Sequence, residues 1–282
     1  MSVAVTAASG QLGRAVVRAL IAHPDAPEVV GLARTPAKAA DLGIEVRSGD
    51  YNEPEQLADS LRGVDTVLLV SGLDAPELRI AQHRNVLDAA RRAGVRKVVY
   101  TSVQGPDEDS AFSPVVQSNR RTEQDVRESG LTWSIGRNGI YIEPDVEYID
   151  GYRARGEIAN SAGGGRCGYT TRDELAFAYA RLLLDDAHDG RTVNLNGEPI
   201  TQRELADHLN RTFGTELSYR EMTSEEFIAD RTAELGEFFG PIIGGIYDGI
   251  RAGVYSDTGD FAEVAGRPHV TWDEYFSEVT PR

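Results

Sequence analysis

Residues Val3 to Arg14 read V-A-V-T-A-A-S-G-Q-L-G-R, and this stretch decides the fold of the chain. An apolar strand runs into a turn that contains glycines, and a helical segment follows directly. The unpaired N–H groups at the start of such a helix favour anionic charge. Glycines in the turn let a phosphate group approach the backbone closely. The pattern is typical of the first β-turn-α unit of a dinucleotide-binding fold.

The turn departs from the G-x-x-G-x-x-G spacing at its first position. Ala7 stands there, whereas Gly10 and Gly13 occupy the other two positions. An alanine fits a tight turn when its φ angle stays negative. Ala7 can therefore replace the glycine on condition that its φ stays negative, and the sequence leaves open whether its methyl group crowds the cofactor or weakens its binding.

A second buried strand, Val29–Ala33, ends at a basic residue about 20 positions beyond the glycines, where such folds recognise the adenosine ribose. An acidic residue there would bind the 2′-hydroxyl of NAD. Arg34 and the hydroxyl of Thr35 instead offer donors to the 2′-phosphate of NADP. The sequence therefore predicts NADP(H) as cofactor, the alternative being that Arg34 is a solvated cation at a strand end.

Length and charge narrow the class of protein. The 282 residues suit one large α/β domain with or without a smaller appendage. A formal net charge of −16 opposes nucleic acid or an anionic membrane as the main partner. A single cysteine, Cys167, excludes an internal disulfide, and we recognise no signal peptide or long apolar run. We expect a cytoplasmic protein.

Strand-like and helix-like segments alternate through the first half of the chain, which favours a doubly wound (Rossmann) parallel sheet. The expected strands are Val3–Thr6, Val29–Ala33, Glu45–Ser48, Thr66–Val70, Lys97–Thr101 and Thr132–Gly136. The expected helices are Gln11–Ile21, Pro54–Arg62, Gln82–Ala93 and Ser118–Ser129, with Gly94 as a C-cap. Ligands of such sheets bind beyond the strand ends, so one crevice is expected to be lined by Thr6, Arg34, Asp50, Ser71, Ser102 and Asn138.

The regular alternation of strand-like and helix-like segments becomes weaker after about Ile140. We expect a Rossmann core over residues 1–140 and a smaller, mainly helical substrate-side lobe over residues 141–282. The segments expected there are a short helix at Glu143–Tyr152, a helix at Thr171–Asp185, a strand at Thr192–Leu195 that returns to the sheet, and helices that start at Thr201 and Ser224.

The chain resembles the NmrA-like group of atypical short-chain dehydrogenases/reductases, and within it the bacterial type 2 NADPH:quinone oxidoreductases. The match spans nearly the whole chain. It rests on A-A-S-G-Q-L-G at Ala7–Gly13, R-T-P-A-K-A at Arg34–Ala39, G-D-Y at Gly49–Tyr51, the segment Gln82–Val95, Y-T-S at Tyr100–Ser102, R-N-G-I-Y at Arg137–Tyr141 and T-R-D-E-L-A at Thr171–Ala176.

The resemblance implies a cofactor role for each of these segments. The phosphate turn would comprise Thr6, Ala7, Ser9, Gly10, Gln11, Leu12 and Gly13. Arg34 would hold the 2′-phosphate, Asp50 and Tyr51 would approach the adenine, and Ser71 and Gly72 would flank the ribose. Ser102 and Asn138 would face the nicotinamide. Asn119 departs from the His or Lys of related proteins, which removes the basis for a proton-relay role there.

Catalytic chemistry must proceed here without the tyrosine–lysine pair of standard short-chain reductases. No Tyr-x-x-x-Lys occurs, and the only lysines are Lys38 and Lys97. A quinone suits this absence, because its reduction yields a resonance-stabilised anion that takes a proton from water. The catalytic candidates are therefore Ser102, Asn138 and Tyr141, which would orient the substrate on the nicotinamide. Tyr141, Tyr148 and Tyr152 either line a flat pocket or belong to an ordinary core.

Three functions remain open from the sequence. The leading hypothesis is an NADPH-dependent oxidoreductase that reduces a quinone-like small molecule. The second is an NmrA-like redox sensor that binds NADP without turnover and signals to a protein partner. The third is a reductase of aromatic polyketide-like intermediates. The five histidines and Cys167 show no metal-ligand spacing, so no metal is expected.

Overall fold

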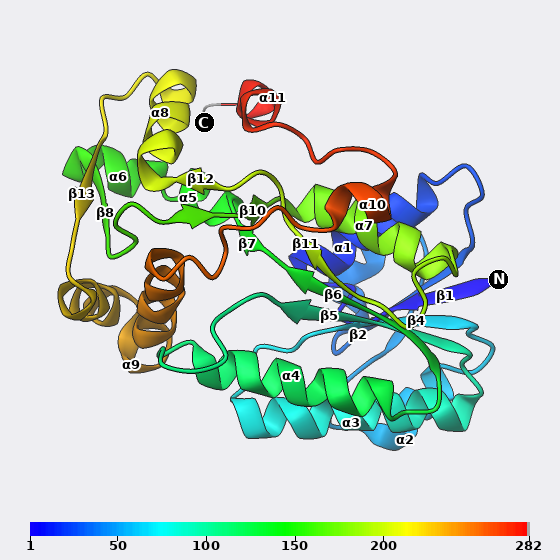
Figure 1. The fold of residues 1–282 in the computed structure, drawn as a ribbon. Coiled ribbons are helices and arrows are strands. Elements are labelled where there is room, and N and C mark those ends of the chain that lie inside the picture. Colours follow the sequence, from blue (N-terminus) through cyan, green and yellow to red (C-terminus); the bar gives the residue numbers. More distant parts are fainter. Residues whose placement is uncertain (281–282) are drawn as a thin grey trace.

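A seven-stranded sheet forms the centre of the molecule in the computed structural model, which describes residues 1–280 (Figure 1). Every neighbouring pair of its strands is parallel. The spatial order is β11-β6-β5-β4-β1-β2-β3, so the chain reverses its winding direction beside β1. The strands are β1 (Ser2–Val5), β2 (Glu28–Ala33), β3 (Glu45–Ser48), β4 (Thr66–Val70), β5 (Lys97–Val103), β6 (Thr132–Asn138) and β11 (Thr192–Leu195).

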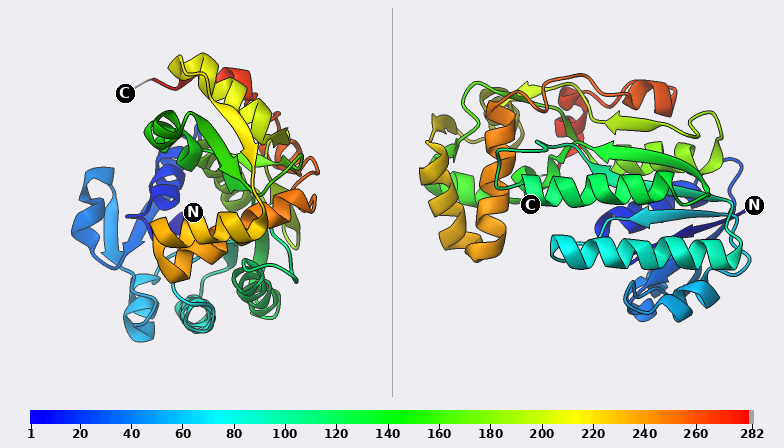
Figure 2. Two further views of the ribbon diagram at one scale, coloured as in Figure 1. Left: turned by 90° about the vertical axis from the view of Figure 1, so that its left-hand side faces the viewer. Right: turned by 60° about the horizontal axis from the view of Figure 1, so that its bottom comes forward.

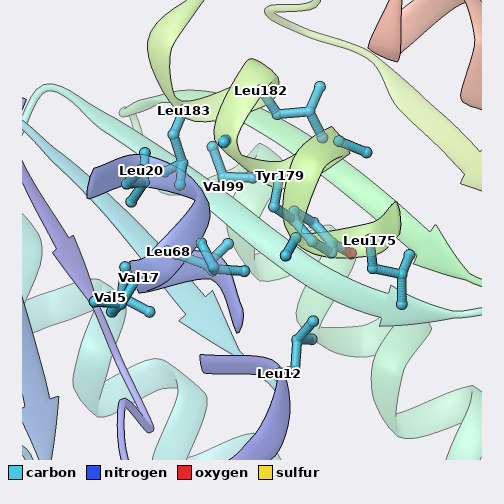
Figure 3. Packing of buried hydrophobic residues seen from close by; sticks show 14 of the residues in the cluster. Val5, Leu12, Val17, Leu20, Leu68, Val99, Leu175, Tyr179, Leu182 and Leu183 are labelled. Atoms are coloured by element: carbon cyan, nitrogen blue, oxygen red, sulfur yellow. The ribbon is translucent and has the colours of Figure 1, made fainter. Parts of the chain in front are cut away.

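Helices cover both faces of this sheet. One face carries α1 (Gln11–Ile21) and α7 (Arg172–Leu184), which contact each other. Their apolar residues form one core cluster with Val5, Leu68 and Val99 of the sheet (Figure 3). The other face carries α2 (Pro54–Ser60), α3 (Pro76–Ala93) and α4 (Ser113–Arg127) over a second cluster. Because both faces are covered, the strands are almost continuously apolar. The predicted doubly wound fold is confirmed.

The remaining elements gather mainly beyond the edge at which the strands of the sheet end (Figures 1 and 2). Three small two-stranded ladders and several helices with a core of their own build this part. They are β7 (Ile140–Tyr141), α5 (Glu143–Glu147), α6 (Ile149–Arg155), β8 (Glu157–Asn160), β9 (Arg166–Cys167), β10 (Tyr169–Thr170), β12 (Ile200–Thr201), α8 (Gln202–Phe213), β13 (Ser218–Glu221), α9 (Ser224–Arg251) and α11 (Trp272–Glu278). A short helix, α10 (Phe261–Ala265), instead packs on α7.

Helix α9 is folded back on itself. Gly236 interrupts it with φ 83° and ψ 170°, and a Cβ atom at Gly240 would lie 2.4 Å from Cα of Thr232. A Cβ atom at Gly244 would likewise lie 2.3 Å from Ile228. Glycines therefore allow the two halves of α9 to pack closely.

Several predicted boundaries change in the structure. The strand over Thr192–Leu195 does join the sheet beside β6, as predicted. Helices α3 and α4 begin six and five residues earlier than predicted, because Pro76 and Pro114 occupy first-turn positions that tolerate proline. The predicted helix Glu143–Tyr152 is wrong as a single element, since α5 and α6 meet at Tyr148. Although α7 and β11 follow residue 140, they lie in the layers of the Rossmann core.

Among residues 1–280, no helix combines the length and the apolar composition that a membrane span requires. No group of three or more His, Cys, Asp or Glu side chains in this part of the chain is arranged to hold a metal ion.

Candidate functional site

Polar residues follow the strands at one edge of the sheet, where the winding direction changes. Thr6 comes directly after β1 and Ser71 directly after β4, while Ser102 and Asn138 lie at the ends of β5 and β6. The registers pair Ser102 with Arg137 and Asn138 with Leu195. Arg34 and Asp50 follow β2 and β3 along the same edge. The structure therefore brings the predicted crevice residues to one side, where ligands of this fold class bind.

The backbone of Ala7 does not meet the condition of a negative φ. Its φ is +48°, in the left-handed region that alanine seldom adopts. The cause is close packing inside the turn, because a Cβ atom at Gly13 would lie 2.4 Å from the carbonyl oxygen of Ala7. At Gly10 the corresponding distance is 3.2 Å. The turn therefore has the backbone conformation of a glycine turn, with an alanine in the left-handed position.

The start of α1 is open to an anion. Gly10 is the N-cap residue, and neither a side-chain cap nor an acidic residue occupies the first turn. Within residues 1–280 the N–H groups of Gln11, Leu12 and Gly13 have no backbone acceptor outside the helix, as expected for a helix start. Ser9 is half-buried, Gly10 and Gln11 are exposed, and Leu12 is buried in the core. This cradle fits a pyrophosphate group.

Thr6 and Tyr51 are locked together beneath the crevice. Both are buried, and the Tyr51 hydroxyl donates to the carbonyl oxygen of Val70 at 2.8 Å. The Thr6 hydroxyl oxygen accepts the N–H of Val70 at 2.9 Å and lies 2.5 Å from the Tyr51 oxygen. Burial raises the pKa of Tyr51, so this phenol stays protonated. The pair joins β1, β4 and the loop after β3.

Two basic side chains beyond β2 are exposed. Arg34 and Lys38 form no side-chain hydrogen bond or ion pair within residues 1–280, and Lys38 lies on the 3-10 helix Pro36–Leu42. Arg14 of α1 is instead engaged, because it donates to Asp41 at 2.6 Å. Two uncommitted cations beside the start of α1 suit a phosphate group better than a ribose hydroxyl.

The loop after β4 is held by buried polar side chains. Ser71 receives its support from Thr101, whose hydroxyl oxygen accepts the Ser71 N–H at 2.9 Å. The Ser71 hydroxyl lies 3.2 Å from Oδ1 of Asn119, which also accepts the hydroxyl of Tyr100 at 2.7 Å. Asn119 is thus a buried acceptor that joins α4 to β4 and β5.

Gly72 in the same loop is held from α3. Its N–H donates to Nε2 of His83 at 3.0 Å, and Nδ1 of His83 lies 3.0 Å from the Thr122 hydroxyl. Since the Gly72 N–H requires an acceptor, the imidazole carries its proton on Nδ1. Burial lowers the pKa of His83 to about 3, with the charge of Arg79 acting in the same direction. His83 is therefore a neutral anchor of the loop.

Ser102 donates its hydroxyl hydrogen to Oε1 of Glu123 at 2.7 Å, and both side chains are buried. Glu123 also binds Arg137 at 2.7 Å and Arg120 at 3.0 Å. Although burial opposes its ionisation, hydrogen bonds from Arg137 and Ser102 lower the pKa of Glu123 below its ordinary value. The Ser102 hydrogen is therefore committed to Glu123, and the predicted catalytic role of Ser102 stays a prediction.

Asn138 and Tyr141 form the other part of the predicted nicotinamide side. Nδ2 of Asn138 donates to the Tyr141 hydroxyl oxygen at 3.2 Å, and its Oδ1 lies 2.5 Å from the hydroxyl of Tyr179 on α7. Within residues 1–280 the Tyr141 hydroxyl hydrogen has no acceptor. Burial raises the pKa of Tyr141 to about 12, against the opposing hydrogen bond from Asn138. Tyr141 is thus a protonated phenol with a free hydrogen.

Tyr148 and Tyr152 lie elsewhere. The Tyr152 hydroxyl donates to buried Asp145 at 2.6 Å, and its ring packs in the core of the outer lobe. Tyr148 packs edge-on against Tyr152 with ring centroids 5.0 Å apart and donates to Glu234. Of the two interpretations offered by the sequence, the ordinary core applies to Tyr152.

Sequence reasoning missed the supporting residues of this edge. The sequence did not assign Glu123 or Tyr179 to the site, and it did not predict the hydrogen bonds that His83 forms with Gly72 and Thr122. The fully buried Tyr179 carries a hydroxyl group, and buried hydroxyl groups need partners. That signal predicts an acceptor near the Tyr179 hydroxyl group, but it does not identify Asn138 as that acceptor.

Comparison with known proteins adds the family. A family model described as NAD(P)H-binding matches residues 7–186, which include the phosphate turn and most of the Rossmann core. The chain belongs to this NAD(P)H-binding family. In the matched segment, the cradle at the start of α1, the exposed Arg34 and the anchored loop after β4 fit the shape and charge of a dinucleotide.

Several relatives that match over nearly the whole chain are named as oxidoreductases or reductases. Quinone oxidoreductase 2 of Escherichia coli (strain K12) is 30% identical over 98% of each chain. The crystal structure of the Escherichia coli NADPH-dependent quinone oxidoreductase complexed with NADPH has a TM-score of 0.89 at 30% identity, covering 98% of each chain. The NADP(H) complex of triphenylmethane reductase from Citrobacter sp. has a TM-score of 0.88 at 34% identity, covering 99% of this chain and all of the other.

These findings confirm the family resemblance stated from the sequence. The chain is an NAD(P)H-dependent oxidoreductase, and its cofactor class is the one predicted. The roles of individual residues stay predictions.

Proposed function

We propose that this oxidoreductase uses NADPH to reduce a quinone or a similarly planar, conjugated carbonyl compound. The observation that carries the proposal is the lack of a tyrosine–lysine acid pair. Of the two lysines, Lys97 lies at the start of β5 and is fully buried. Its Nζ lies 2.9 Å from the carbonyl oxygen of Asp185. Lys38 is exposed on the 3-10 helix after β2. Neither lysine is hydrogen-bonded to a tyrosine in the described part of the chain.

A substrate of this enzyme must therefore tolerate slow or external protonation. A reduced quinone meets that condition, because its negative charge is delocalised over an aromatic ring and water supplies the proton. Tyr141 helps by donating a hydrogen bond to the carbonyl oxygen on which charge develops. Its pKa of about 12 keeps it protonated throughout the physiological range. The named activities of the relatives, on quinone and on triphenylmethane dyes, support a planar conjugated substrate.

The proposed roles are given along the crevice, from the start of α1 to the end of β6. NADPH supplies the hydride when bound. The turn and helix start bind the pyrophosphate, Arg34 holds the 2′-phosphate, and the loop after β4 flanks the ribose. Asn138 and Tyr141 face the nicotinamide and the substrate, while Ser102 acts by holding Glu123 and the end of β5. The proposed cofactor contacts are Thr6, Ala7, Ser9, Gly10, Gln11, Leu12, Gly13, Arg34, Asp50, Tyr51, Ser71, Gly72 and Asn138.

Steady-state kinetics test the proposal. Purified enzyme with NADPH is supplied with benzoquinone, naphthoquinones, a polycyclic quinone and a triphenylmethane dye, and loss of NADPH is followed without oxygen. We expect turnover of the quinones, with a fall in kcat of about 100-fold in Tyr141→Phe and unchanged NADPH binding. Turnover of the dye alone, or tight NADPH binding without oxidation by any quinone, contradicts the proposal.

A further inference from the structure

We infer that Tyr179 is a positioning residue, which acts through Asn138 to commit the hydroxyl hydrogen of Tyr141 to the substrate. The inference rests on the proposed function of Tyr141 as a hydrogen-bond donor. It concerns a residue on α7 whose ring lies in the apolar cluster between α1, α7 and the sheet (Figure 3). The ring packs in the core, whereas the hydroxyl group lies at the boundary of the apolar cluster and contacts the end of β6.

The hydrogen-bond directions follow from the atoms present. The Tyr179 hydroxyl lies 2.5 Å from Oδ1 of Asn138 and 3.0 Å from the carbonyl oxygen of Gly136. Both of these are acceptors, so Tyr179 is the donor and its shorter contact is to Asn138. The amide NH₂ of Asn138 then faces Tyr141 and donates to its hydroxyl oxygen at 3.2 Å. Because that oxygen accepts from Asn138, the Tyr141 hydrogen points elsewhere.

The opposite orientation of the Asn138 amide would reverse this result. Its oxygen would face Tyr141 and accept the Tyr141 hydrogen, which would then be lost to the substrate. The distances favour the orientation described, because 2.5 Å is an O–H···O separation and 3.2 Å suits N–H···O. Tyr179 thus decides between a Tyr141 that donates to the substrate and one that donates to the protein.

Gly136 makes room for this arrangement. A Cβ atom at Gly136 would lie 2.5 Å from the Tyr179 hydroxyl and 2.8 Å from a methyl group of Leu195. A side chain there would therefore displace the phenol from Asn138. Tyr179 and Asn138 are both buried, so water does not readily replace the missing donor if the hydroxyl is removed. The geometry depends on the pair of Gly136 and Tyr179 together.

The test is Tyr179→Phe, which keeps the ring in the core and removes one hydroxyl group. With the substrate that the wild-type enzyme turns over, we expect kcat to fall about 10-fold, while the dissociation constant for NADPH stays unchanged. Tyr219→Phe is a matched control, because the buried Tyr219 hydroxyl also contacts a main-chain carbonyl and an amide oxygen, both of Asn160 at 3.1 Å. It lies on β13 of the outer lobe and is expected to retain wild-type kcat.

A double-variant cycle separates positioning from structural damage. In the Tyr141→Phe background, Tyr179→Phe is expected to have no further effect on kcat, because the hydrogen that it positions is already absent. Independent, multiplying losses overturn the inference, as does a Tyr179→Phe enzyme with wild-type kcat.

A second readout needs neither cofactor nor substrate. A fluorotyrosine incorporated at Tyr141 reports its own hydrogen bonding by fluorine NMR in the apo protein. Its resonance is expected to shift in Tyr179→Phe and to stay in Tyr219→Phe. An unshifted resonance overturns the inference. If the wild-type enzyme reduces no quinone while the resonance shifts, the proposed function fails and the arrangement of the three side chains stands.

Discussion

Replacing Ala7 by glycine is expected to stabilise the enzyme, although the same replacement usually destabilises a protein. The φ of Ala7 is +48°, and holding a non-glycine residue in this region costs about 1–2 kcal/mol. Glycine removes that cost. It also gives the unfolded chain more conformational entropy, which lowers the free energy of unfolding by about 0.4–1 kcal/mol. The methyl group is partly buried against the core, which reduces the gain further. The net stabilisation is about 0.3–0.8 kcal/mol.

Urea and thermal unfolding of the cofactor-free protein measure the effect. A gain of this size raises the melting temperature by about 1–3 °C. Ala22→Gly is the matched control, because Ala22 is exposed and has φ −79°. That variant is expected to lose about 0.4–1 kcal/mol, because glycine raises the chain entropy of the unfolded state and relieves no strain at this position. If Ala7→Gly lowers the stability as Ala22→Gly does, the backbone at Ala7 is not strained and the reasoning is refuted.

Three further variants test other parts of the structure. Arg34→Ala is expected to weaken NADPH binding by about 1.5–3 kcal/mol and to leave NADH binding unchanged, because only NADPH carries the 2′-phosphate. Calorimetric titration checks this against Arg91→Ala, an equal charge change near the end of α3, and equal losses for both nucleotides contradict it. Burial raises the pKa of Asp145 to about 6, so the contribution of this carboxyl group to stability is fully present below its ordinary pKa and is lost as the pH rises through 6. Asp145→Asn is therefore expected to raise the melting temperature relative to wild type at about pH 8 and not at about pH 4, and a difference independent of pH refutes this assignment. Lys97→Met leaves the Asp189 carboxylate without its partner and is expected to lower the unfolding free energy in urea by about 3 kcal/mol. Lys97→Met combined with Asp189→Leu should recover most of that loss, and no recovery would show that the ion pair is not its source.

The Rossmann core could be predicted from the sequence because its signals are local. Buried parallel strands appear as short apolar runs, and the glycine at position 94 ends α3 in the left-handed conformation that the sequence indicated. The start of α3 was missed because its N-cap is Ala75, which has no side chain that could cap a helix. Local patterns therefore predicted the elements, and their ends were wrong where the local signal was absent.

The strain at Ala7 could not be predicted because its cause is a contact across the turn. The position of Gly13 against the Ala7 carbonyl oxygen sets the bend of the chain, and this contact is visible only in three dimensions. Alanine by itself prefers a negative φ, and the packing at the cradle overrides this preference.

The same limit applies to Tyr179, and it shows what a buried tyrosine can add to a site. Together with Leu175 and Leu182, Tyr179 follows the periodicity of a core helix, and its ring does lie in the core. Periodicity describes the ring and carries no information on the hydroxyl group, whose partner on β6 is 41 residues away in the chain. The hydroxyl group must nevertheless find an acceptor, because leaving it unpaired in the core would cost about 1–3 kcal/mol. Helix α7 packs on a face of the parallel sheet, and the Tyr179 hydroxyl reaches the carboxyl end of β6, where the acceptors belong to residues that line the crevice, as Asn138 does. A buried tyrosine at such a place therefore links the stability of the core to the orientation of the groups that act on the substrate.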